Sequence, residues 1–135
     1  CEEQYAKDNN LEILGRIVST SVQGCKADTM GLGPIGATQK ALARAKLSIN
    51  DIDIVELNEA FASQSLACIK DLKIDPNKVN LDGGALALGH PLGATGARIT
   101  GKVAQLLKRE NKKYALASQC IGLGMGIATI IESVD

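Results

Sequence analysis

The chain has 135 residues, 45% of them hydrophobic, and its 15 basic and 15 acidic side chains balance at pH 7. A chain of this length is expected to form one domain that buries roughly two thirds of its unfolded surface. The charge balance gives no support to a nucleic-acid partner. The one group of cations, at positions 108, 109, 112 and 113, lies at the end of a predicted helix, where it complements the helix dipole.

Four cysteines, at positions 1, 25, 68 and 120, have no Cys-x-x-Cys spacing and only one histidine to accompany them. This pattern favours neither a metal site nor a disulfide framework, so we expect no metal and a reducing, cytoplasmic location. One uncharged run, residues 114–131, is long enough for a membrane span. Glycines at 122, 124 and 126 interrupt it, which favours two strands joined at a glycine corner over a membrane-spanning helix.

Alternating strand and helix patterns predict the organisation of the chain. Residues 1–10 are expected to be the end of a preceding helix or a linker, and residues 11–135 the domain itself. Because the first residue is Cys1 and not methionine, we interpret the chain as a piece of a longer protein. The predicted strands are 11–22, 53–57, 78–81, 113–120 and 125–133, and the predicted helices are 36–46, 59 onward and 93–110. This βαβαβαββ order predicts an α/β fold with a mixed five-stranded sheet covered by helices.

Residues 83–96 form a glycine-rich stretch that contains His90, the single histidine. The stretch has no charged side chain and few polar ones, so it is predicted to be a loop pressed against protein or ligand. Pro91 biases His90 toward an extended backbone, which would hold the imidazole in one direction. His90 is therefore a candidate for chemistry, although a core histidine satisfied by backbone groups fits the local sequence equally well. The glycine spacing does not match a phosphate-binding loop.

Three polar or reactive side chains follow or end predicted strands. In α/β sheets the binding crevice lies at the carboxyl ends of the strands, which predicts that Asn58, His90 and Cys120 share one edge. Each also has a structural interpretation. Asn58 fits a helix N-cap with Glu59 in the first turn, and a buried cysteine is usually a small hydrophobe. Their convergence favours a site.

The motifs Asn58-Glu59-Ala60-Phe61, Gly89-His90-Pro91 and Cys120-Ile121-Gly122-Leu123-Gly124-Met125-Gly126 occur in this order. With the loop at residues 30–34, they resemble the carboxyl-terminal half of thiolases, the acetyl-CoA acetyltransferase and 3-ketoacyl-CoA thiolase family, over about residues 11–132. The resemblance implies acyl transfer between coenzyme A thioesters: two acetyl-CoA give acetoacetyl-CoA plus CoA, or a 3-ketoacyl-CoA is cleaved by thiolysis. It also implies a nucleophilic cysteine in an amino-terminal half outside this chain, so the segment alone would be inactive.

The resemblance also implies roles for individual residues. His90 would take the proton of the absent nucleophile, and Asn58 would hold a water that completes an oxyanion site. Cys120 would act as the general acid/base on the α-carbon, and Gly122 would offer its backbone N–H to the tetrahedral intermediate. The pantetheine and acyl tunnel would be lined by three further residues, Met30, Ala60 and Phe61.

One position departs from the family pattern, because Leu123 stands where the family commonly has glycine. If that position needs a positive φ, a leucine there strains the turn by about 1 kcal/mol or more. The implied partners are acyl-CoA, the amino-terminal thiolase domain of the same chain, and further copies of the protein in a dimer or tetramer. No covalently bound cofactor is expected, because coenzyme A thioesters are substrates. The alternative function is a non-catalytic thiolase-like domain that binds lipid or acyl groups or serves assembly.

Overall fold

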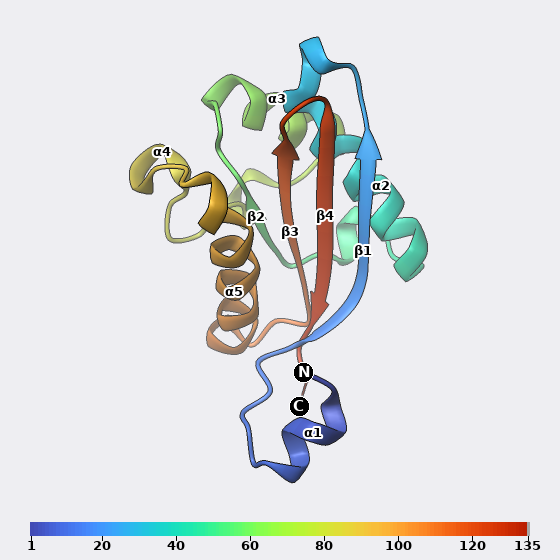
Figure 1. The fold of residues 1–135 in the computed structure, drawn as a ribbon, viewed down its shortest axis with the longest axis vertical. Helices are drawn as coiled ribbons and strands as arrows, with labels where there is room; N and C mark the ends of the chain where they lie inside the picture. Colours follow the sequence, from blue (N-terminus) through green and yellow to red (C-terminus); the bar gives the residue numbers. More distant parts are fainter. Residues whose placement is uncertain (135) are drawn as a thin grey trace.

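The computed structural model describes residues 1–134, which form a four-stranded mixed sheet with helices on both faces (Figure 1). The strands are β1 (Arg16–Gly24), β2 (Ile54–Leu57), β3 (Tyr114–Ile121) and β4 (Met125–Glu132). The α-helices are α1 (Glu3–Asp8), α2 (Gly33–Ala45), α3 (Ala62–Leu72), α4 (Ala85–Leu88) and α5 (Leu92–Glu110). Three short 3-10 helices complete the chain: η1 (Ala27–Leu32), η2 (Ile49–Asp51) and η3 (Pro76–Lys78).

The sheet has the order β1-β4-β3-β2. The strands β2 and β3 run parallel, while β4 pairs antiparallel with both β3 and β1. The mixed α/β class predicted from the sequence is therefore confirmed, and so is the antiparallel pairing of the last two strands through a tight glycine link.

The prediction of a fifth strand at 78–81 is wrong. Of that segment only Val79 forms a bridge, with Val55 of β2. The next residue, Asn80, has a positive φ of 49° and so leaves the extended conformation. Its side chain replaces the missing ladder, because the amide oxygen accepts from Leu57 N at 3.0 Å and the amide nitrogen donates to Leu57 O at 2.9 Å. Asparagine tolerates this left-handed conformation better than most residues.

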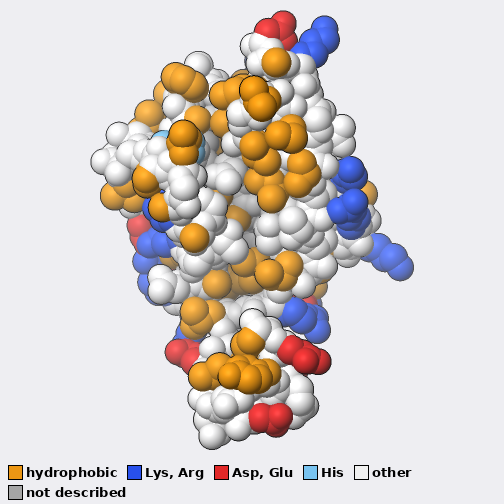
Figure 2. Space-filling view, viewed as in Figure 1, with side chains coloured by type: hydrophobic (Ala, Val, Ile, Leu, Met, Phe, Trp, Pro, Cys, Tyr) orange, Lys and Arg blue, Asp and Glu red, His pale blue; other side chains and the backbone are white. Residues whose placement is uncertain are grey.

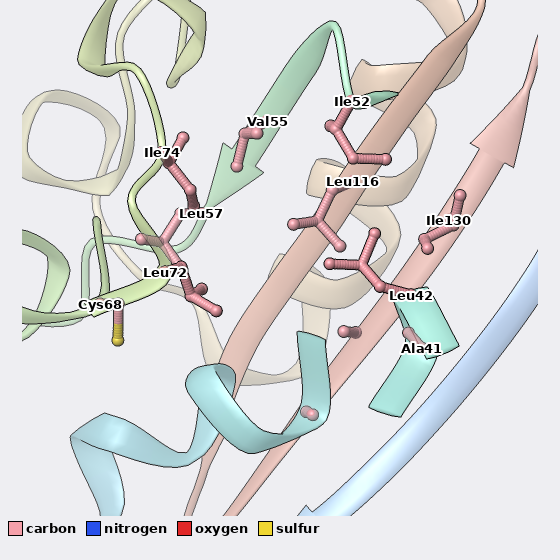
Figure 3. Close-up of a cluster of buried hydrophobic side chains, with 12 residues drawn as sticks. Ala41, Leu42, Ile52, Val55, Leu57, Cys68, Leu72, Ile74, Leu116 and Ile130 are labelled. Carbon is pink, nitrogen blue, oxygen red and sulfur yellow. The ribbon is translucent and has the colours of Figure 1, made fainter. Parts of the chain in front are cut away.

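Two apolar clusters hold the helices on opposite faces of the sheet. One lies against α2 and α3 and includes Leu57, Leu116 and Ile130, which Figure 3 shows side by side with Leu42 and Leu72. The cluster on the other face joins α5 to the sheet and consists of Ile54, Ile99, Val103, Leu106, Leu107, Ala115, Ala117 and Ile131. Because alternate strand residues point to opposite faces, even-numbered residues of β2 and odd-numbered residues of β3 face α5.

The turn between β3 and β4 is fixed by its glycines. Gly124 has a φ of +95°, and a side chain there would overlap the carbonyl oxygen of Cys25. The same turn is tied to that segment because Cys25 N donates to Gly124 O at 2.8 Å. Leu123, the residue that departs from the family pattern, has a φ of 70° and is 92% exposed. Leu123 therefore has the positive φ that strains a leucine backbone.

Candidate functional site

The glycine-rich stretch that holds His90 is anchored by Glu59. The Glu59 carboxylate accepts from Leu86 N in the first turn of α4 and from the Asn80 amide, both at 2.9 Å. Gly84 makes this contact possible, because a Cβ there would lie 2.5 Å from a Glu59 oxygen. Glu59 was expected in the first turn of the following helix. That assignment is wrong, since α3 begins at Ala62, and the carboxylate instead serves α4.

His90 is oriented by a threonine one turn into α5. Its Nδ1 lies 2.7 Å from Thr95 Oγ1, and Thr95 is fully buried. The Thr95 hydroxyl also lies 3.1 Å from Pro91 O, and when it donates its hydrogen there, its oxygen accepts from Nδ1–H. The proton on Nδ1 leaves Nε2 with a free lone pair, which is the form a general base needs.

A cavity of about 540 Å³ joins most of the predicted site residues. Its walls include His90, Cys120 and Gly122, together with the three residues predicted to line a tunnel, Met30, Ala60 and Phe61, and three that were not predicted: Leu92, Gln119 and Ile121. A Cβ built on Gly122 meets no atom within 4 Å, so its backbone faces open space. A ligand can therefore approach that backbone closely.

Cys120 lies at the end of β3, paired with Gly126 of β4. It is a free thiol and is buried at the wall of the cavity. Burial raises the pKa of the Cys120 thiol above its usual value, because the thiolate loses hydration. The group is thus protonated at neutral pH, which suits a side chain that gives a proton to a carbanion and takes one back.

Asn58 does not line the cavity but lies beside it. Its backbone N–H donates to Ser118 O at 2.9 Å, so it sits next to Gln119 on the neighbouring strand. The side chain is 1% exposed, and neither its oxygen nor its nitrogen has a hydrogen-bond partner in the protein. Asn58 does not cap α3, whose N-cap is Phe61. The interpretation of this asparagine as a helix N-cap is therefore wrong.

The mouth of the site is apolar and open. The loop around His90 was predicted to be pressed against protein or ligand, but within the described chain Leu92 is 83% exposed, and Leu86 and Leu88 are also exposed. Phe61 lies exposed as well. Figure 2 shows hydrophobic side chains gathered around the pale-blue histidine on this face. So much apolar surface beside a cavity marks a surface that another protein segment or a ligand covers.

Two features limit other kinds of site in the described part of the chain. Residues 1–134 contain no cluster of His, Cys, Asp or Glu side chains arranged to hold a metal ion. Among the same residues, no helix combines the length and apolar character that crossing a membrane requires.

Sequence reasoning missed Thr95 and Gln119. Thr95 lies on the buried face of α5, five residues after His90, and a hydroxyl at that spacing is a weak signal in sequence. Gln119 directly precedes Cys120, but an amide on a strand gives no hint of the cavity until the packing of α5 is known.

Comparison with known proteins identifies the family to which this fold belongs. The family model described as "Thiolase, C-terminal domain" matches residues 11–133. A 3-ketoacyl-CoA thiolase from Shewanella sp. (strain ANA-3) is 54% identical over 136 residues, covering 98% of this chain and 35% of that protein. The chain therefore spans about a third of the length of the relatives it matches.

Solved structures agree with this match. The crystal structure of human mitochondrial 3-ketoacyl-CoA thiolase superposes with a TM-score of 0.97 at 49% identity, covering 100% of this chain and 34% of that one. The structure of the human enzyme in complex with CoA gives a TM-score of 0.95 at 50% identity, with 98% and 34% coverage. The chain belongs to the thiolase family, as its carboxyl-terminal domain.

Proposed function

We propose that this domain supplies half of a composite thiolase active site within a longer chain. The reaction is acyl transfer between coenzyme A thioesters, run as thiolytic cleavage of a 3-ketoacyl-CoA or, in reverse, as acetyl-CoA C-acetyltransferase chemistry that condenses two acetyl-CoA. The observation that supports it most directly is the single cavity that holds His90, Cys120 and Gly122. A matched relative is named 3-ketoacyl-CoA thiolase, and one matched structure contains CoA.

In the cleavage direction, a cysteine thiolate from the amino-terminal half attacks the 3-keto carbon of the substrate. His90 Nε2 takes the proton of that thiol, which is needed because a free thiol is only a few per cent ionised near neutral pH. The bond between C2 and C3 then breaks, and Cys120 gives its proton to C2 of the departing acetyl-CoA. The acyl group then passes from the nucleophile to the thiol of an incoming CoA, whose proton is taken by the Cys120 thiolate. The released nucleophile thiolate recovers its proton from His90, which restores both groups for the next turnover.

The tetrahedral intermediates carry an oxyanion that needs fixed donors. Gly122 offers its N–H from the edge of the cavity, and Asn58 offers a water held by its unpartnered amide. A donor of this kind contributes about 3 kcal/mol to the transition state. Met30, Ala60 and Phe61 form walls for the pantetheine arm and the acyl group.

The apolar mouth of the site would be covered by the amino-terminal half of the protein and by the acyl-CoA. The intact thiolase would be a cytoplasmic homo-oligomer, a dimer or tetramer, and the isolated segment would be inactive because it lacks the nucleophile. No covalently bound cofactor takes part, since the coenzyme A thioester is itself a substrate.

Separation of the two half-reactions tests the proposal. In the intact thiolase, Cys120→Ala should still form an acyl-enzyme from acetyl-CoA but should lose condensation with a second acetyl-CoA by at least about 100-fold, the range typical of a general acid/base. Cys68→Ala is the matched control, because Cys68 is also a buried thiol but lies in the α3 core. Normal condensation by Cys120→Ala would refute the assignment.

A further inference from the structure

All the buried side-chain polar atoms that lack a hydrogen-bond partner within residues 1–134 belong to four residues: Glu56, Asn58, Arg98 and Gln119. Buried polar groups are almost always hydrogen-bonded, so a cluster of exceptions needs an explanation. The unpartnered atoms are one Glu56 oxygen, both amide atoms of Asn58, Arg98 Nε and the Gln119 oxygen.

The sheet register places these residues together. Glu56 pairs with Ala117 across β2 and β3, and Asn58 follows two residues later beside Gln119, so all three face α5. The Gln119 amide nitrogen approaches Gly96 of α5, where a Cβ would lie only 3.3 Å away. Arg98 lies on the same helix, about one turn after Thr95. The cluster therefore fills the space between the sheet and the first turns of α5.

This cluster adjoins the catalytic cavity without being part of it. Gln119 borders both, and Gly96 follows directly after Thr95, which orients His90. Glu56 and Asn58 are each 1% exposed. The unpartnered atoms of all four residues are shielded from solvent within residues 1–134. Water is the partner small enough to satisfy them.

We infer that Glu56, Asn58, Arg98 and Gln119 enclose a buried water-binding site behind His90, and that Glu56 is a positioning residue which orients the Asn58 amide through that water. The inference rests on the proposed function, in which the Asn58 amide holds the water that completes the oxyanion site. An ionised carboxylate only accepts hydrogen bonds. A water between Glu56 and Asn58 therefore donates one hydrogen to the Glu56 carboxylate and the other to the Asn58 amide oxygen. That contact leaves the Asn58 nitrogen available to donate to the water of the oxyanion site.

The charges around Glu56 make its ionisation sensitive to pH. Arg98 and Lys102 of α5 favour the carboxylate, while Asp82 and Glu59 disfavour it. Burial outweighs these charges and raises the pKa of Glu56 to about 7. When Glu56 is protonated, its O–H donates to the water. The water then no longer has to donate one hydrogen to Glu56 and the other to Asn58. The orienting contact is therefore strongest above neutral pH.

The experiment uses the intact thiolase and the substitution Glu56→Gln. Glutamine keeps the size of the side chain but adds a donor and removes the charge. We expect kcat at pH 8 to fall about 10-fold with KM unchanged, and the difference from wild type to shrink below pH 6, where wild-type Glu56 is also protonated. Glu56→Asp, which retains the carboxylate, should keep the wild-type form of the pH profile. Glu132→Gln, at the far strand edge against Arg16, is the matched control and should leave the profile unchanged.

A high-resolution crystal structure of the wild-type thiolase supplies a readout that does not depend on activity. We expect ordered water within hydrogen-bond distance of both Glu56 and Asn58. A dry cluster in which Glu56 and Arg98 pair directly would overturn the inference, and so would wild-type kcat at every pH in Glu56→Gln. Failure of the wild-type enzyme to form any acyl-enzyme would instead refute the proposed function. The crystallographic test of the buried water does not depend on that result.

Discussion

Thr95 Oγ1 lies 2.7 Å from His90 Nδ1 and holds the imidazole in one orientation. The same hydroxyl lies 3.1 Å from Pro91 O, and when it donates its hydrogen there, its oxygen accepts from Nδ1–H. In that arrangement Nε2 is the basic nitrogen. Pro91 contributes twice, since it biases His90 toward an extended backbone and also supplies the carbonyl that orients Thr95.

Removal of the Thr95 hydroxyl should impair acylation. Thr95→Val keeps the shape of the side chain but leaves His90 free to change its tautomer and orientation. We expect the rate of acyl-enzyme formation from acetyl-CoA in the intact thiolase to fall about 10- to 100-fold, which is part of the contribution of a general base. Thr95→Ser should retain most of the rate. A valine variant that acylates at the wild-type rate would contradict this role.

The buried carboxyl of Glu56 should make stability depend on pH. Its pKa is about 7 in the folded chain against 4.5 for an exposed glutamate, so the folded state binds the proton more tightly. The free energy of unfolding should therefore decrease as the pH rises from about 4.5 to 7 and then level off, by roughly 3 kcal/mol for this group.

Urea unfolding of the 135-residue chain measures this effect. Glu56→Gln should be more stable than wild type at pH 8 and nearly equal to it at pH 4. A difference between the two proteins that stays constant over this range would show that Glu56 does not change its ionisation in the folded chain. The same substitution is expected to lower activity, so stability and activity should change in opposite directions.

Leu123 should cost stability because of its backbone conformation. A left-handed φ costs a leucine roughly 1–2 kcal/mol, and its exposed side chain gains little in return. Glycine relieves the strain but loses about 0.5–1 kcal/mol through its freer unfolded state. We expect Leu123→Gly to raise the free energy of unfolding by roughly 0.5 kcal/mol. Leu66→Gly, at an exposed helical position in α3, should lower it by about 1 kcal/mol. An equal decrease in the free energy of unfolding in both variants would show that Leu123 is not strained.

Two glycines should respond in opposite directions to alanine. A Cβ on Gly126 of β4 would overlap the carbonyl group of Gly33, where α2 begins, and backbone cannot move aside as a flexible side chain does. Gly126→Ala should therefore lower stability by more than about 2 kcal/mol. Gly101→Ala in α5 meets nothing within 4 Å and should raise stability by up to about 1 kcal/mol. Chemical denaturation of the 135-residue chain checks both, and a mild effect at Gly126 would show that the contact between α2 and β4 is loose.

Sequence patterns predicted the elements with strong periodicity. The long helix at 93–110 and the last two strands lie within one or two residues of α5, β3 and β4, because each buries a clear apolar stripe or alternating face. The segment at 78–81 has the composition of a strand, yet Asn80 turns the chain and pairs through its side chain. That competition between side chain and backbone for the same partners is invisible in composition.

The candidate site was predictable to the extent that its residues follow strand ends. Cys120 and Gly122 lie at the end of β3, at the edge where the parallel strand β2 also ends. His90 reaches the same cavity from the link between α4 and α5, and not from a strand end. Thr95 and the buried cluster of Glu56 and Arg98 could not be predicted in this way. They become neighbours only when α5 packs across the sheet, and no local spacing encodes that contact.

The most direct test of the composite site is an intact-mass measurement of the full-length thiolase incubated with acetyl-CoA, followed by peptide mapping of the modified residue. We predict one acetyl group on a cysteine that precedes this segment in the chain, and we predict that it still forms in Cys120→Ala. An acetyl group on Cys120 itself, or no acetyl-enzyme at all, would contradict the division of roles between the two halves.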